Sequence, residues 1–135
     1  MDVRVVISHP DVGRQVLSDS GGGRVTLTHA GELSSHTATA GGYVVVNRMR
    51  ARHGTATLEL PQNSAADLFM RKWIAYLEQA GAKVFAQTTL TVRDDAAGRT
   101  WTLTGVTPQK WPDITYDQST GNVTWTLLAA DINET

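Results

Sequence analysis

HGTATLELPQNSAADLFMRKWIAYLEQAG, residues 53–81, changes its hydrophobic period at Pro61. Before this proline, apolar and polar side chains alternate, which is typical of a strand with one buried face. After it, Asn63 or Ser64 can cap a helix, and Asp67 stands three residues after Ser64 as an acid in the first turn. Apolar residues then recur at helical spacing, namely Phe69, Trp73, Tyr76, Leu77 and Ala80. We therefore predict one amphipathic helix near residues 64–80, packed against a sheet.

The rest of the chain has the pattern of a β-protein. Short apolar or alternating segments, bounded by glycine, asparagine or aspartate, lie at residues 3–8, 24–28, 43–50, 55–60, 89–93, 100–104 and 122–127. Residues 30–40 are small, polar and aperiodic, so we expect a long loop there. The predicted fold class is mainly β: an antiparallel β-sandwich or partly closed barrel of about seven to eight strands with one packed α-helix. A chain of 135 residues is expected to form a single domain, 1–135.

The composition excludes several kinds of protein. The chain has no cysteine, so it has no disulfide, no cysteine nucleophile and no cysteine-based zinc site. Its net charge of −1 counts against sequence-independent binding of nucleic acid, which needs a basic surface. The first residues, MDVRVVISHP, carry charge too early for a signal peptide, and no apolar run approaches the ~20 residues of a membrane-spanning helix. We therefore expect no membrane anchoring.

The sequence carries no enzyme signature. Its four histidines are His9, His29, His36 and His53. They form no metal-binding motif, and we expect them to be exposed polar side chains; only a metal site assembled from distant parts of the chain stays open. Asp94 and Asp95 stand in a glycine-containing hairpin loop, where acids usually form turns. We predict no catalytic, cofactor-binding or metal site, and hence no enzyme.

A row of arginines stands in the stretch NRMRARHG, residues 47–54. Arg48, Arg50 and Arg52 occupy every second position, so in an extended chain their guanidinium groups point to one face. Like charges on one face repel one another unless anions neutralise them. The interpretation that we favour places the row at a boundary between copies of the chain, and a solvated strand face is the alternative. The candidate acids on the other copy are Asp94, Asp95, Asp113 and Asp117.

Aromatic and threonine residues indicate further surfaces. Trp111 lies between two prolines, where the chain cannot form a central strand. It is either a lid over one end of the core or a contact for a neighbouring chain. Trp73, Trp101 and Trp125 are instead expected to pack together. Threonines repeat on several strand faces, which form either the solvent side of a sheet or a smooth, weakly charged wall.

The order of these features carries a resemblance over residues 20–132. A glycine-bearing loop, TAGGY (39–43), leads to the basic stretch, which ends in RHGTATLEL (52–60). PQNSAA (61–66) then opens the helix, a hairpin surrounds DDAAGR (94–99), and GNVTWTL (121–127) is the last long strand. This order resembles bacteriophage tail tube proteins, including the tubes of contractile tails and related injection systems. In that family a strand of the GTAT type before a polar, serine-containing helix start is recurrent.

The resemblance implies a structural function. Tube proteins of this kind form hexameric rings that stack, and their sheets join into one β-barrel around a channel for DNA and ejected proteins. Residues 30–42 and the hairpin 43–60 would reach adjacent subunits or the next ring, and the helix would face a sheath. The implied location is the virion tail, assembled in the host cytoplasm. The implied partners are copies of the chain itself, with sheath, baseplate and tape-measure proteins where the tail has them, and no cofactor.

Two other functions fit the same residues. The first is a minor baseplate or tail-completion ring protein with the same fold but few copies. The second is a monomeric carbohydrate-binding β-sandwich module, in which Trp111 and Tyr116 would stack against sugars. Self-assembly into rings or tubes separates both of these from the tail tube.

Overall fold

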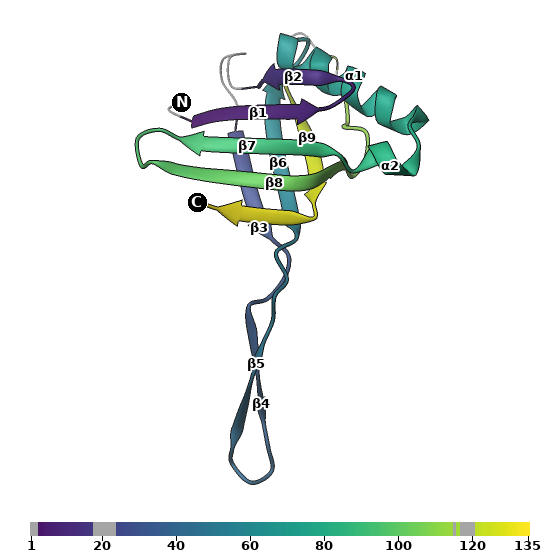
Figure 1. Ribbon diagram of the computed structural model, residues 1–135. Coiled ribbons are helices and arrows are strands. Elements are labelled where there is room, and N and C mark those ends of the chain that lie inside the picture. The colour runs from purple at the N-terminus through teal and green to yellow at the C-terminus, as the bar shows by residue number, and fades with distance from the viewer. Residues whose placement is uncertain (1–2, 18–23, 115, 117–120) are drawn as a thin grey trace.

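The computed structural model describes residues 3–17, 24–114, 116 and 121–135. These residues form a compact body from which a long two-stranded arm projects (Figure 1). The strands are β1 (Val3–His9), β2 (Gly13–Val16), β3 (Arg24–His29), β4 (Ser34–Ala38), β5 (Val44–Arg48), β6 (Gly54–Pro61), β7 (Thr88–Asp94), β8 (Arg99–Pro108), β9 (Asn122–Ala129) and β10 (Asp131–Glu134). The helices are α1 (Ala65–Gln79) and α2 (Ala82–Phe85). The described chain is mainly β, as predicted.

Eight of the described strands make one antiparallel sheet that folds over itself. Its order is β2-β1-β7-β8-β9-β6-β3, and β10 pairs with β8 beside this path. In Figure 1, β1, β7, β8 and β10 form one layer, and β3, β6 and β9 cross behind it. The layers are joined on one side, where the end of β8 pairs with β9. On the other side β3 pairs with β6 alone among the described strands, so the sheet is an open sandwich and not a closed barrel.

Gly105 marks the bend at which β8 passes from one layer to the other. Its φ of 62° is in the left-handed region, where glycine meets no steric penalty. A Cβ atom at this position would also lie 2.7 Å from the Cβ of Ala130. The pairing of β7 with β8 shifts its register at the same place, between Thr88 and Leu90. The two-layer fold therefore depends on a glycine that turns one strand.

The core lies between the two layers, and strand alternation builds it. Along β6, residues Gly54 to Pro61 alternate between buried and half-buried, as the sequence pattern predicts. Leu58, Leu103 and Leu127 point inward and are fully buried. On the other side of the β3-β6-β9 layer, Thr26 pairs with Thr57, which pairs with Thr126. The outer face of this layer is thus a threonine ladder.

Helix α1 closes one end of the sandwich, close to the predicted boundaries. Ser64 is its N-cap, and the Ser64 Oγ accepts a hydrogen bond from the backbone N–H of Asp67 at 3.2 Å. The predicted buried stripe was partly wrong, because Tyr76 is 40% exposed and Phe69 is only half-buried. The helix instead buries Ala66, Asp67, Met70, Trp73, Ile74 and Leu77.

The side chain of Asp67 belongs to the buried face of the helix. It is fully buried, and its Oδ1 accepts a hydrogen bond from the indole N–H of Trp125 at 3.0 Å. Its Oδ2 accepts from the backbone N–H of Asn63 and pairs with the Arg71 guanidinium at 3.1 Å. The fold tolerates this buried carboxylate because Arg71 neutralises its charge and the N–H donors hydrogen-bond its oxygens. These bonds link the start of α1 to Trp125 of β9.

The tryptophans divide between core and margin. Trp73 and Trp125 are fully buried, and the Trp73 indole N–H donates to the Thr88 hydroxyl at 2.8 Å. Trp101 was expected beside them but is only half-buried, with its ring centre 6.3 Å from that of His29. His9 also departs from prediction, because it is buried: its Nδ1 accepts from the Asp11 N–H and its Nε2 bonds the Val84 carbonyl. Burying the imidazole of His9 costs little free energy because both of its ring nitrogens have hydrogen-bond partners.

The largest error of prediction concerns residues 30–40, which are not a loop. They contain β4, which pairs antiparallel with β5, so that Ser34 faces Arg48 and Ala38 faces Val44. The two chain segments leave the body beside Gly54, where a Cβ would lie 2.1 Å from the Thr28 carbonyl oxygen. They turn back at the tip between Thr39 and Tyr43, which share a backbone hydrogen bond of 2.7 Å. No face of this ribbon is buried, so no alternation was imposed on its sequence.

Candidate assembly surface

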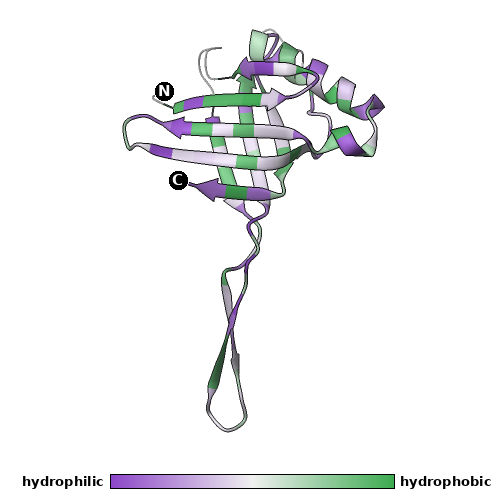
Figure 2. Cartoon of the chain, in the orientation of Figure 1, coloured by the Kyte–Doolittle hydropathy of each residue, from purple (hydrophilic) through white to green (hydrophobic). Residues whose placement is uncertain are grey.

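The arm, defined as residues 30–53, has no core of its own. None of its residues is buried, although it carries Leu33, Tyr43, Met49 and the three valines 44–46. Figure 2 shows a hydrophobic stretch on the arm, far from the hydrophobic strands of the body. An isolated two-stranded hairpin is at best marginally stable in water. A long apolar hairpin that stands away from its own domain therefore requires a further surface to cover it.

One face of the arm is more apolar than the other. Side chains alternate along β5, so Val44, Val46 and Arg48 share a face. Their partners on β4 are Ala38, His36 and Ser34, respectively. Val46 is 65% exposed on this face. We call this set of β5 residues, Val44, Val46 and Arg48, the valine face; it combines aliphatic surface with one cation.

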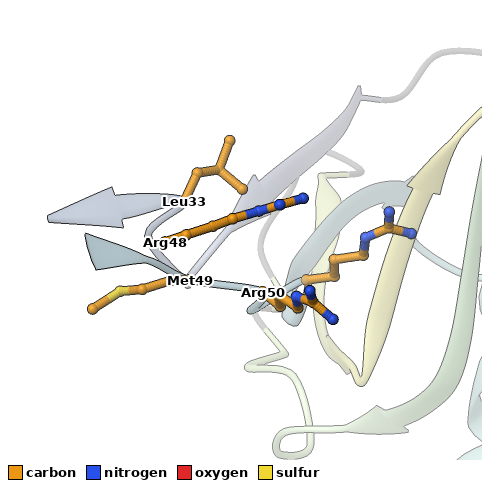
Figure 3. Close-up of a pocket in the computed structure, with 5 residues that line it drawn as sticks. Leu33, Arg48, Met49 and Arg50 are labelled. Carbon is orange, nitrogen blue, oxygen red and sulfur yellow. The ribbon is translucent and has the colours of Figure 1, made fainter. Parts of the chain in front are cut away.

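The arginine row lies where the arm joins the body. Strand β5 ends at Arg48, so Arg50 and Arg52 lie outside any strand and are not aligned by strand geometry as predicted. All three arginines nevertheless line one hollow of about 670 Å³ together with Leu33 and Met49. In Figure 3 the side chains of Arg48 and Met49 extend in opposite directions from the ribbon. Leu33 lies beside Arg48 in the same view, so the lining of the hollow mixes guanidinium groups with apolar side chains.

The arginine row has no acid of its own among the described residues. Arg52 donates a hydrogen bond to the Asn133 side-chain oxygen at 3.5 Å. Among the described residues, no ion pair involves Arg48, Arg50 or Arg52. The guanidinium groups are exposed, so their charge is available to a carboxylate on another molecule. The structure thus brings the row together without a partner within the described chain.

The four candidate acids have different environments. Asp94 ends β7, and its Oδ1 accepts the backbone N–H groups of Ala96 and Ala97, which makes it a turn former. Asp95 pairs with Arg93 at 2.8 Å in the same turn. Asp113 lies on an exposed segment beside Lys110 in a hollow of about 360 Å³. Asp117 lies outside the described residues.

Trp111 is held to helix α1. Its indole N–H donates to the carboxylate of Glu78, yet the residue is 42% exposed. Ile114 and Tyr116 follow it on the same exposed segment. The contact with Glu78 places Trp111 against the helix, and its exposed side remains available to another chain.

The described residues offer no reaction centre. They contain no group of three or more histidine, aspartate or glutamate side chains that could hold a metal ion. The hydrogen bond from the Tyr76 hydroxyl to Asp11, at 2.8 Å, raises the pKa of this tyrosine above its ordinary value. That shift takes an exposed phenol further from reactivity at neutral pH. No helix in the described ranges is both long and apolar enough to cross a membrane.

Sequence reasoning did not single out Leu33 or the exposed valines of β5, although it expected the hairpin 43–60 to reach other subunits. The run from residue 43 to residue 50 was predicted only as a strand. The residues before this strand could have indicated its exposure. They are polar and flanked by glycine, so they provide no second apolar strand for it to pack against. Apolar residues in that setting indicate a covering partner from outside.

Comparison with known proteins decides the family. The family model described as Bacteriophage PhiTE tail tube protein matches residues 1–135. The chain belongs to this family of tail tube proteins. The predicted resemblance is thereby confirmed, and the chain is a structural protein of a tail, not an enzyme. A search of curated proteins by sequence gives no significant match.

Solved structures share the tail tube fold at low sequence identity. A chain of the anti-feeding prophage baseplate is 14% identical with a TM-score of 0.65, and the alignment covers 98% of this chain and 91% of that one. A chain of the sheath-tube complex of the PVC extracellular contractile injection system is 13% identical with a TM-score of 0.60, covering 98% and 88%. A chain of the anti-feeding prophage tube-terminating cap is 11% identical with a TM-score of 0.59, covering 98% and 87%. At these identities the likeness establishes the fold.

Proposed function

We propose that this tail tube protein assembles into hexameric rings that stack into a tube, and that DNA passes through its channel during ejection. The observation that carries the proposal is the arm: a hairpin on a domain of tail tube fold, with exposed valines and with arginines that have no ion pair to any described residue. Such a surface is stable only when another copy covers it. In a tail tube, the copy that covers the arm would be a neighbouring subunit.

Two features of the body support a ring. Strand β3 is an open sheet edge, and a ring of copies would protect such edges by pairing or covering them. The threonine ladder on β3, β6 and β9 would supply a polar wall with little charge. DNA that must slide past a wall is held less by uncharged hydroxyl groups than by arginines. We infer that the threonine ladder faces the channel and that the arginine row does not.

The surroundings of the tube form part of the proposal. Solved structures of similar fold include a sheath-tube complex, a baseplate and a tube-terminating cap. We propose a contractile tail in which α1 lies outside the channel wall and faces a sheath, with a baseplate and a tape-measure protein as further partners. The tube would belong to the virion tail and assemble in the host cytoplasm.

A minor ring protein is the second candidate, because the same fold occurs in chains of baseplate and cap structures. Copy number separates the two functions. A tube protein polymerises without limit, since each ring offers the next ring the same surface. A baseplate or terminator ring stops after one or two layers.

Negative-stain electron microscopy of the purified full chain, together with sedimentation velocity over a range of concentrations, tests the proposal. We expect six-fold rings that stack into hollow tubes as the concentration rises. Single rings that never stack would favour the minor ring protein. A species that stays monomeric at high concentration in low and moderate salt would contradict both.

A further inference from the structure

The open side of the sandwich contains a slot that the described residues (3–17, 24–114, 116 and 121–135) leave unfilled. It has a volume of about 310 Å³ and is lined by Val3, Val25, Leu27, His29, Val92, Asp94 and Trp101. These residues come from β1, β7 and β8 in one layer and from β3 in the other. The slot exists because β3 pairs with β6 alone among the described strands, so the layers separate along this side. We call it the lateral slot.

We propose that the lateral slot of one copy receives the valine face of another copy's arm. Val44 and Val46 would enter between the layers, and Arg48 would meet Asp94 at the rim. This inference rests on the proposed self-assembly and names the surface that the arm uses. It goes beyond that function because it assigns the acid that pairs with the arginine row.

Shape and polarity favour this pairing. The slot is lined mainly by branched aliphatic side chains and by Trp101, and valines of an extended strand fit between two sheet layers. The valine face offers two aliphatic side chains in alternate positions, both more than half exposed. Burial of apolar surface on both sides supplies the driving force for association.

Charge complementarity selects Asp94 from the candidate acids. Both turn hydrogen bonds of Asp94 use its Oδ1, and its Oδ2 accepts none within the described chain. Asp95 already pairs with Arg93. Asp113 shares its hollow with Lys110, which would repel an incoming arginine, and apart from Pro112 the rest of that hollow is polar. Asp94 is therefore the acid that stands beside an apolar slot with a free oxygen.

The direction of the arm favours a second copy as its partner. The arm extends straight away from the body (Figure 1), whereas the lateral slot is lined by β3 and by β1, β7 and β8 of the body itself. In this conformation the valine face of an arm does not lie against the slot of its own domain. The slot and the arm are complementary surfaces on different sides of one molecule, which is the arrangement that builds open, repeating assemblies.

Disulfide trapping tests the pairing directly, because the chain has no cysteine. One protein carries Val46→Cys, and a second, with a larger tag, carries Leu27→Cys in the slot. Val25→Cys is the second slot variant, in case Leu27→Cys unfolds the body by circular dichroism. Thr124→Cys, in the polar hollow, is the matched control. After mixing under assembly conditions and mild oxidation, we expect a heterodimer with either slot variant at least tenfold more abundant than with the control.

The outcomes separate this inference from the proposed function. Tubes that form normally while the arm cysteine links to Thr124→Cys, or to neither site, would overturn the slot and leave the tube function intact. Proteins that fold but never assemble would overturn both. Asp94→Asn adds a charge test, because it keeps the Oδ1 acceptor of the turn and removes the anion. We expect it to need several-fold higher protein concentration to assemble, and unchanged assembly would contradict the Arg48–Asp94 pair.

Discussion

The body and the arm use the same kinds of side chain in opposite ways. Leu58 on β6 is 1% exposed, whereas Leu33 at the base of the arm is 74% exposed. In the body, strands such as β6 direct alternate residues into a shared core, so a single chain buries these apolar side chains by itself. The arm has apolar residues but no layer to face. The difference indicates that the body folds alone and that the arm completes its burial only in an assembly.

Removal of the arm should have the largest effect, and on assembly alone. Residues 30–53 can be replaced by Asn-Gly, because His29 already pairs with Gly54 and this dipeptide closes a two-residue hairpin. We expect a folded monomer, since no arm residue is buried, and a complete loss of rings and tubes. Electron microscopy and circular dichroism provide the two measurements. Tubes formed by the armless protein would refute the arm as the connector of copies.

A matched pair of leucine substitutions sharpens the comparison by stability. Leu58→Ala removes a buried side chain from the core and should lower the free energy of unfolding by about 2–5 kcal/mol. Leu33→Ala, in the exposed arm, should change it by less than about 0.5 kcal/mol. Chemical denaturation of the monomers at low concentration gives both values. Equal losses would mean that the arm is part of the same cooperative unit as the body.

The fold of the body was largely predictable because its strands obey a single rule. One face of each strand enters the core, so alternation in β6, β8 and β9 is visible in the sequence. Helix α1 was predictable from its capping serine and its apolar period. Strand β4 was not predictable, because its residues face solvent on both sides and hydrogen bonds to β5 impose no side-chain pattern.

A second matched pair contrasts two Arg–Asp contacts. Asp67→Ala leaves the Trp125 N–H without its acceptor and Arg71 without its anion, in a fully buried position. We expect a loss of about 3 kcal/mol in unfolding free energy. Asp95→Ala breaks a pair of which both side chains are more than half exposed, and should cost less than about 1 kcal/mol. Thermal and urea unfolding of the two variants would show whether burial or ion-pair distance sets the cost.

Asp67 also shows where site prediction from sequence ends. Ser64 and Asp67 were recognised as a helix start, but the carboxylate's bond to Trp125, 58 residues away, has no local pattern. The same holds for the arginine row, whose residues were recognised as a group although strand β5 ends at the first of them. The sequence pattern identified which arginines belong to the surface. Only the folded structure shows that they line one hollow and that none of them forms an ion pair with a described acid.

Charge reversal in the arginine row should have the smallest effect on the fold and a measurable effect on assembly. Arg50→Glu changes an exposed side chain with no ion pair among the described residues, so the monomer should keep its unfolding midpoint. It should raise the protein concentration needed for tubes by about tenfold, which corresponds to ~1.4 kcal/mol. Lys110→Glu, a charge reversal in the polar hollow, is the control and should shift assembly less. Because exposed charges are screened by salt, the difference should shrink between low and high ionic strength. A mutant that assembles like the native protein at low salt would place Arg50 in solvent, and the arm would then act through its valines and the Arg48–Asp94 pair.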